Sequence, residues 1–186
     1  ETLLQPILHT LNLSQANITM GYSLKNSVLY RLVDIVFQTF INSVQMQSNI
    51  HSKMDNAQFL PNIYYYRDLI NLLSNIYIKL LIGKTNSYSN NFIAIGQIFY
   101  DKQTFDNSFP ASDSALKDLL SSLLFSSKNA NDVVEQIKLL IAFIDSRLQL
   151  KDVEKEVVLL LQQCLEHLKN LTKELQLKDI FSLQML

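Results

Sequence analysis

The C-terminal part of the chain, residues 111–186, contains neither glycine nor proline. These two residues mark most turns between strands, so a sheet of many short strands would need several of them over such a distance. The same stretch is rich in leucine, lysine, glutamate and glutamine, which favour helices. We therefore expect an all-α fold without a sheet.

The composition is typical of a globular chain, with 48% hydrophobic and 18% charged residues. A chain of this length buries about 70% of the surface that it exposes when unfolded, so it needs no disulfide or metal to form a core. We expect one helical domain over residues 1–186, or else a sub-division near residues 105–112. Because the first residue is Glu1 and not methionine, we interpret the chain as a fragment of a larger protein.

Apolar residues at helical spacing predict about seven helices, arranged as a bundle or as a short α-solenoid-like stack. The first is expected over residues 2–11. The second is expected to begin after a cap at Ser23 and to end near Val44, where a polar loop over residues 47–58 follows.

The third helix is predicted to begin near Pro61 and to end at Gly83, because proline suits a first helical turn and glycine suits a C-terminal cap. The next apolar run, residues 92–100, could form a strand, but a single strand would have no partner, so we expect a helix. A loop over residues 101–113 then leads to a short leucine-rich helix.

The remaining residues could form one long helix, but the apolar stripe is interrupted. Its first part consists of Val133, Ile137, Leu140, Ile144 and Leu148, and its next positions are the charged residues Lys151 and Asp152. It restarts as Val153, Val157, Leu160, Cys164, Leu168, Leu171 and Leu175. We therefore predict two helices, with Asp152 capping the second and Cys164 buried in its core-facing stripe.

Three consecutive tyrosines, residues 64–66, stand near the start of the third predicted helix. Neighbouring side chains on a helix point about 100° apart, so the three cannot all face the core. The core-facing side of this helix would carry Leu69, Leu73, Ile76 and Leu80. That geometry places Tyr65 and Tyr66 at the edges of the core and points Tyr64 outward.

The outward side of the same predicted helix holds apolar residues as well as polar ones, which indicates that something covers it. Tyrosine and arginine are enriched at binding hot spots. We hypothesise a partner-binding surface that consists of Tyr64, Arg67, Asn71, Ile78 and Ile82. The alternative is that another part of the same chain covers this side.

No pattern in the sequence predicts a catalytic, cofactor-binding or metal site. The segment Gly83–Thr85, "GKT", resembles the end of a phosphate-binding loop, but the motif requires a further glycine where this chain has Ile78. Cys164 and His167 have the spacing of two metal ligands on a helix, yet two more ligands would be needed. No acidic residue lies on an apolar stripe. We expect that the chain is not an enzyme.

Charge and hydropathy narrow the classes of partner. The net charge of −1 argues against nucleic acid, because phosphate neutralisation needs a basic surface. The most apolar run, Leu69–Ile82, is interrupted by polar residues and is too short for a transmembrane segment. The single cysteine excludes an intrachain disulfide, and together with the absence of a signal peptide it favours an intracellular, cytoplasmic location.

Two functions are compatible with these observations. The first is a non-catalytic protein–protein interaction or scaffold domain that acts through a surface. The alternative is a helical module with an internal cavity for a small apolar or lipid ligand, since 8 tyrosines and 10 phenylalanines could line a pocket. The position of the phenylalanines distinguishes the two functions: if Phe37, Phe40, Phe92, Phe99 and Phe143 fill the interior at normal packing density, no cavity remains.

Overall fold

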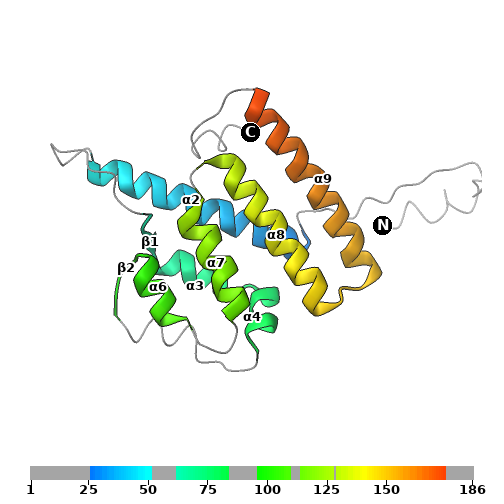
Figure 1. The fold of residues 1–186 in the computed structure, drawn as a ribbon, viewed down its shortest axis with the longest axis horizontal. Helices are drawn as coiled ribbons and strands as arrows, with labels where there is room; N and C mark the ends of the chain where they lie inside the picture. The colour runs from blue at the N-terminus through cyan, green and yellow to red at the C-terminus, as the bar shows by residue number, and fades with distance from the viewer. Residues whose placement is uncertain (1–25, 52–61, 84–95, 110–113, 128, 175–186) are drawn as a thin grey trace, which may run out of the picture.

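A computed structural model of the protein describes residues 26–51, 62–83, 96–109, 114–127 and 129–174. Within these ranges it contains seven helices and one two-stranded sheet (Figure 1). The predicted all-α bundle is confirmed. The expectation that no sheet would form is wrong, although the sheet is small. The helix predicted over residues 2–11 lies outside the described residues.

Helix α2 (Val28–His51) is the longest helix of the described part and contacts α3, α4, α8 and α9. Its first turn is capped by Ser27, whose hydroxyl oxygen accepts a hydrogen bond from the Tyr30 N–H at 3.0 Å. The helix therefore starts later than the expected Ser23 cap, and it continues past Val44 into the segment that we expected to be a loop.

The tyrosine triplet begins as a strand and not as a helix. Strand β1 (Tyr64–Tyr65) pairs antiparallel with β2 (Phe99–Tyr100), so that Tyr64 lies opposite Tyr100 and Tyr65 lies opposite Phe99. The strand interpretation of residues 92–100, which we rejected for lack of a partner, is thus correct for the last two of them. The partner strand is the triplet itself.

The predicted third helix is divided into α3 (Tyr66–Leu73) and α4 (Ile76–Ile82). The side chain of Asn75 caps α4 by accepting a hydrogen bond from the Tyr77 N–H at 3.0 Å. This break changes which side of the chain faces the core, so Ile76 and Leu80 are exposed. Gly83 ends α4 with a positive φ of 88°, as the glycine cap predicted, although its ψ of 177° is not that of a left-handed helix.

Helix α6 (Lys102–Ser108) occupies part of the segment that we expected to be a loop over residues 101–113. Asp101 caps the start of this helix, because its carboxylate accepts a hydrogen bond from the Thr104 N–H at 2.8 Å. Helix α7 (Ser114–Ser126) is the predicted leucine-rich helix.

Helices α8 (Ala130–Leu148) and α9 (Asp152–Glu174) confirm the predicted division of the C-terminal stretch. Asp152 is the first helical residue of α9 and not its cap. Glu154 stabilises this end instead, because its carboxylate accepts a hydrogen bond from the Lys151 N–H at 3.1 Å.

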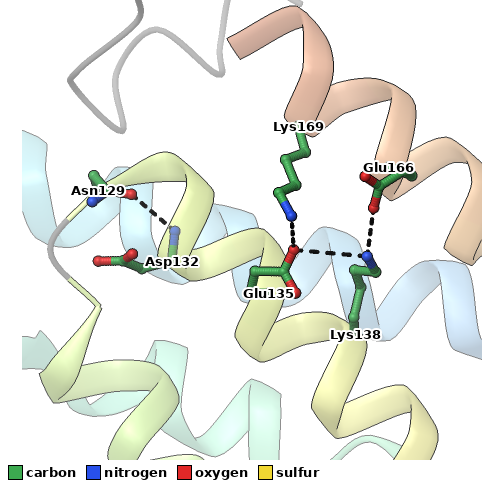
Figure 2. Close-up of polar contacts among 6 residues, drawn as sticks. All are labelled: Asn129, Asp132, Glu135, Lys138, Glu166 and Lys169. Carbon is green, nitrogen blue, oxygen red and sulfur yellow. Dashed lines mark hydrogen bonds and ion pairs between the residues drawn. The ribbon is translucent and has the colours of Figure 1, made fainter. Parts of the chain in front are cut away.

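A chain of charged side chains joins α8 to α9 (Figure 2). Lys138 lies 2.5 Å from Glu166 and 3.7 Å from Glu135, and Lys169 also pairs with Glu135. The hydrogen bond to Glu166 raises the pKa of Lys138, and the hydrogen bond from Lys169 lowers the pKa of Glu135. These groups are accessible to water, so we expect the network to contribute less than about 1 kcal/mol per pair and to set the alignment of the two helices.

The buried side of α9 differs by one position from the predicted stripe. Its core-facing residues are Val157, Val158, Leu161 and Leu165, whereas Val153, Leu160 and Cys164 are exposed. The prediction that Cys164 is buried is therefore wrong. Three consecutive leucines, residues 159–161, make more than one side of this helix apolar, and packing against α8 selects the side that is buried.

The hydrophobic core is one cluster that draws residues from every described helix. Phe105 and Phe109, which lie where a sub-division was considered, belong to it together with residues from earlier and later helices. The largest fully buried side chains include Tyr64, Tyr100, Phe40 and Phe105.

Candidate functional site

Tyr64 does not face outward, so the orientation on which its assignment to a partner surface depended is wrong. Only 1% of the residue is exposed, and its ring makes edge-to-face contacts with Phe40 and Phe125 at 5.9 and 5.3 Å between centroids. The prediction assumed a helix, in which neighbouring side chains point about 100° apart. Residues 64 and 65 instead form a strand, in which alternate side chains point to opposite faces.

The Tyr64 hydroxyl group donates a hydrogen bond to the Leu124 carbonyl oxygen, which also accepts one from Asn62 Nδ2 at 3.2 Å. Leu124 lies in the last turn of α7, where carbonyl groups lack partners within the helix. Tyr64 therefore serves the fold by holding the end of α7. Burial raises the pKa of its phenol, which favours the protonated form that can donate.

The other four residues of the hypothesised surface are divided between the exterior and the core. Arg67 and Asn71 are exposed on α3. Ile78 and Ile82 are buried on α4, with 0% and 8% exposure. The break at Asn75 separates the two pairs, so the five predicted residues do not form one surface.

A different surface forms around Arg67. We call it the aromatic–arginine patch, and it consists of Tyr65, Tyr66, Arg67, Ile98 and Phe99. Ile98 is 56% exposed and Phe99 is 47% exposed, and both tyrosines are half-buried. Figure 1 shows the two strands that carry part of this patch at the side of the molecule away from α9.

Strand pairing brings the two halves of the patch together. Tyr65 lies opposite Phe99, with 6.0 Å between ring centroids, and the Tyr66 N–H donates a hydrogen bond to the Ile98 carbonyl at 2.9 Å. Ile98 was not identified from the sequence, and Phe99 was considered only as one of five phenylalanines that could fill the interior, because their segment was assigned to a helix. The signal present in the sequence was the β-favouring character of both segments, the tyrosine triplet and residues 92–100, although it did not specify that they pair.

The Arg67 side chain lies against the two tyrosines. Its guanidinium carbon is 5.9 Å from the Tyr65 ring centroid and 5.8 Å from that of Tyr66. Arg67 Nε donates a hydrogen bond to the Tyr66 hydroxyl oxygen at 3.1 Å, and this bond lowers the pKa of Tyr66. The arginine is thus oriented by aromatic rings and not by a carboxylate.

The part of the chain that the structure describes contains no group of three His, Cys, Asp or Glu residues that could hold a metal ion. Cys164 and His167 are both exposed on α9. Gly83 ends α4, and the other two residues of the "GKT" segment lie outside the described ranges.

A cleft of about 110 Å³ lies where the starts of α2 and α9 meet α4. Tyr77 donates a hydrogen bond to Glu154 at 2.7 Å there, and this bond holds the pKa of Glu154 below its usual value. Because the carboxylate also accepts from the Lys151 N–H, the geometry accounts for Glu154 as a structural group.

Among the described helices, none has the length and apolar character needed to cross a membrane. Comparison of the chain with protein-family models, with curated proteins and with solved structures finds no match. The candidate site therefore rests on the geometry of the patch.

Proposed function

We propose that this chain is a non-catalytic helical interaction domain that binds another protein through the aromatic–arginine patch. The observation that carries the proposal is the exposure of Ile98 and Phe99 beside the Arg67–tyrosine stack. Single exposed apolar residues are common on protein surfaces, but a cluster of aromatic, aliphatic and arginine side chains is typical of binding hot spots.

Burial of the patch would supply binding free energy. Complete burial of an exposed Ile or Phe side chain contributes roughly 1.5–3 kcal/mol, and about half of Ile98 and Phe99 remains to be buried. Each residue therefore offers about 1 kcal/mol, and the half-buried tyrosines add to this with little loss of side-chain entropy because their rings are already packed.

The alternative of an internal cavity for a lipid or apolar ligand has less support. The cleft between α2, α4 and α9 is smaller than the roughly 300–1,000 Å³ of usual ligand pockets. Phe40 is buried and Phe37 and Phe143 pack partly against the core, whereas Phe99 is exposed. Phe92 lies outside the described residues.

Affinity capture from an extract of the source cells tests the proposal. The wild type is compared with Phe99→Thr, which keeps a strand-favouring residue but removes the ring. Leu139→Thr on α8 is the matched control, because Leu139 is 54% exposed and lies outside the patch. Captured proteins are identified by mass spectrometry and then purified for titration with each variant.

We expect Phe99→Thr to weaken binding of the purified partner about tenfold while the control binds like the wild type. Equal binding by all three proteins would contradict the proposal, and so would a loss confined to Leu139→Thr. Native mass spectrometry of the extracted domain provides a second readout, since a retained apolar small molecule would favour the cavity alternative.

A further inference from the structure

The aromatic–arginine patch also indicates the chemistry of its partner. We infer that it binds an acidic peptide segment, in which a carboxylate lies next to an aliphatic or aromatic side chain. This inference rests on the proposed function and narrows it to one class of partner. Three structural features support it: the orientation of Arg67, the hydrogen bonds that the neighbouring carboxylates make with other residues, and the exposure of Ile98 and Phe99.

Arg67 presents an oriented positive charge. Stacking against Tyr65 and Tyr66, together with the Nε hydrogen bond to the Tyr66 hydroxyl group, restricts the side chain. The planar guanidinium fork matches the two oxygens of a carboxylate, and a restricted fork loses less entropy when it binds one.

Within the described part of the chain, Arg67 takes part in no ion pair, so no carboxylate there neutralises its charge. The carboxylates nearest in the sequence have other roles. Asp68 accepts a hydrogen bond from Asn42 at 3.1 Å, and Asp101 caps α6 through the Thr104 N–H. A carboxylate of the partner would complement Arg67, whereas a basic segment would be repelled.

Ile98 and Phe99 add an apolar contact beside the charge. Phe99 lies against Tyr65, whose ring Arg67 also contacts, and Ile98 is the exposed residue that directly precedes Phe99 and accepts the Tyr66 N–H through its carbonyl. A partner that offered a carboxylate alone would leave these apolar groups in water. A partner that carries an apolar side chain beside its acidic one satisfies both parts of the patch.

Single-stranded nucleic acid could also stack on aromatic rings and contact an arginine. Such binding, however, uses a positively charged groove that follows several phosphates. The patch contains one cation, and the net charge of the chain is −1. The observations therefore favour an acidic peptide, and an oligonucleotide becomes a competing outcome of the test.

The test selects binders from a displayed library of random nine-residue peptides against the wild-type protein. Arg67→Gln keeps a hydrogen-bonding side chain without the charge. Arg147→Gln is the matched control, because Arg147 on α8 is exposed and lies over the Phe143 ring at 5.3 Å. Selected peptides are synthesised, and their dissociation constants for each protein are measured by fluorescence polarisation.

We expect the selected peptides to combine Asp or Glu with a neighbouring aliphatic or aromatic residue. Replacing the acidic residues of a peptide by Asn or Gln should weaken binding about tenfold or more, because a charge-assisted hydrogen bond is lost. Arg67→Gln should cause a similar loss, and Arg147→Gln should bind like the wild type.

Selection of neutral or basic peptides would overturn the inference, as would equal binding by acidic peptides and their amide versions. If Phe99→Thr abolishes such peptide binding while Arg67→Gln does not, the interaction function stands and only the acidic partner is refuted. If no peptide is selected, or if Phe99→Thr has no effect, the interaction function fails at this patch too. Binding of oligothymidine or of phosphatidylserine vesicles in place of peptides would also refute it.

Discussion

Replacement of Tyr64 tests the structural role that separates this residue from the surface. Its ring is fully buried between Phe40 and Phe125, and its hydroxyl group donates to the end of α7. Truncation of a buried aromatic side chain to alanine costs about 3–5 kcal/mol. In a chain of this size each kcal/mol lowers Tm by about 2–4 °C, so Tyr64→Ala should lower Tm by roughly 6–20 °C.

Tyr64→Phe isolates the hydroxyl group. The Leu124 carbonyl keeps its second donor, Asn62, so the loss should be near the usual net value of about 1 kcal/mol for one hydrogen bond. Thermal melts followed by circular dichroism would measure both variants, with Tyr30→Phe on α2 as a half-buried control. If Tyr64→Ala melted within about 2 °C of the wild type, the buried position of Tyr64 would be refuted.

Three further predictions follow from particular residues. Burial raises the pKa of Tyr64 above its ordinary value of 10.0, so the stability that the neutral phenol contributes is fully present below pH 10 and is lost as pH rises further. Between pH 10 and pH 11 the Tm of the wild type should therefore fall more steeply than the Tm of Tyr64→Phe. Parallel curves of Tm against pH would contradict this. Exposed Cys164 should react with a thiol reagent in the native protein as fast as in the urea-unfolded chain, whereas slow labelling would restore the sequence-based expectation of a buried thiol. Ile78→Ala should lower the free energy of unfolding, measured by urea titration, by about 2–5 kcal/mol, because Ile78 is buried. Leu80→Ala should change it by no more than about 0.5 kcal/mol, because Leu80 is exposed. The reverse order of the two effects would refute the break between α3 and α4.

The sequence predicted those parts of the fold that depend on residues near one another in the chain. The division between α8 and α9 followed from the loss of the apolar stripe at Lys151 and Asp152, and the structure confirms it. The end of α4 at Gly83 was predicted because a positive φ favours glycine. Both signals are local, so they can be read without knowledge of the tertiary structure.

The candidate surface could not be predicted because it depends on contacts between distant segments. Pairing between β1 and β2 joins residues 64–65 to residues 99–100, and no local pattern specifies that pairing. The cap at Asn75 then shifted the helical phase, which buried Ile78 and exposed Leu80. The exposure of Arg67 was predicted from the sequence and agrees with the structure. Phe99, its neighbour in the patch, could not be predicted, because the strand pairing brings it next to Tyr65.

Hydrogen exchange measured on the protein alone and in complex with its captured partner tests the central claim most directly, because slower exchange marks the backbone that the partner covers. If the aromatic–arginine patch is the binding surface, protection on binding should be concentrated in residues 64–67 and 98–100, and the exposed side of α9 around Leu160 should be unchanged. Protection confined to α9, with the patch exchanging as in the free protein, would contradict the claim.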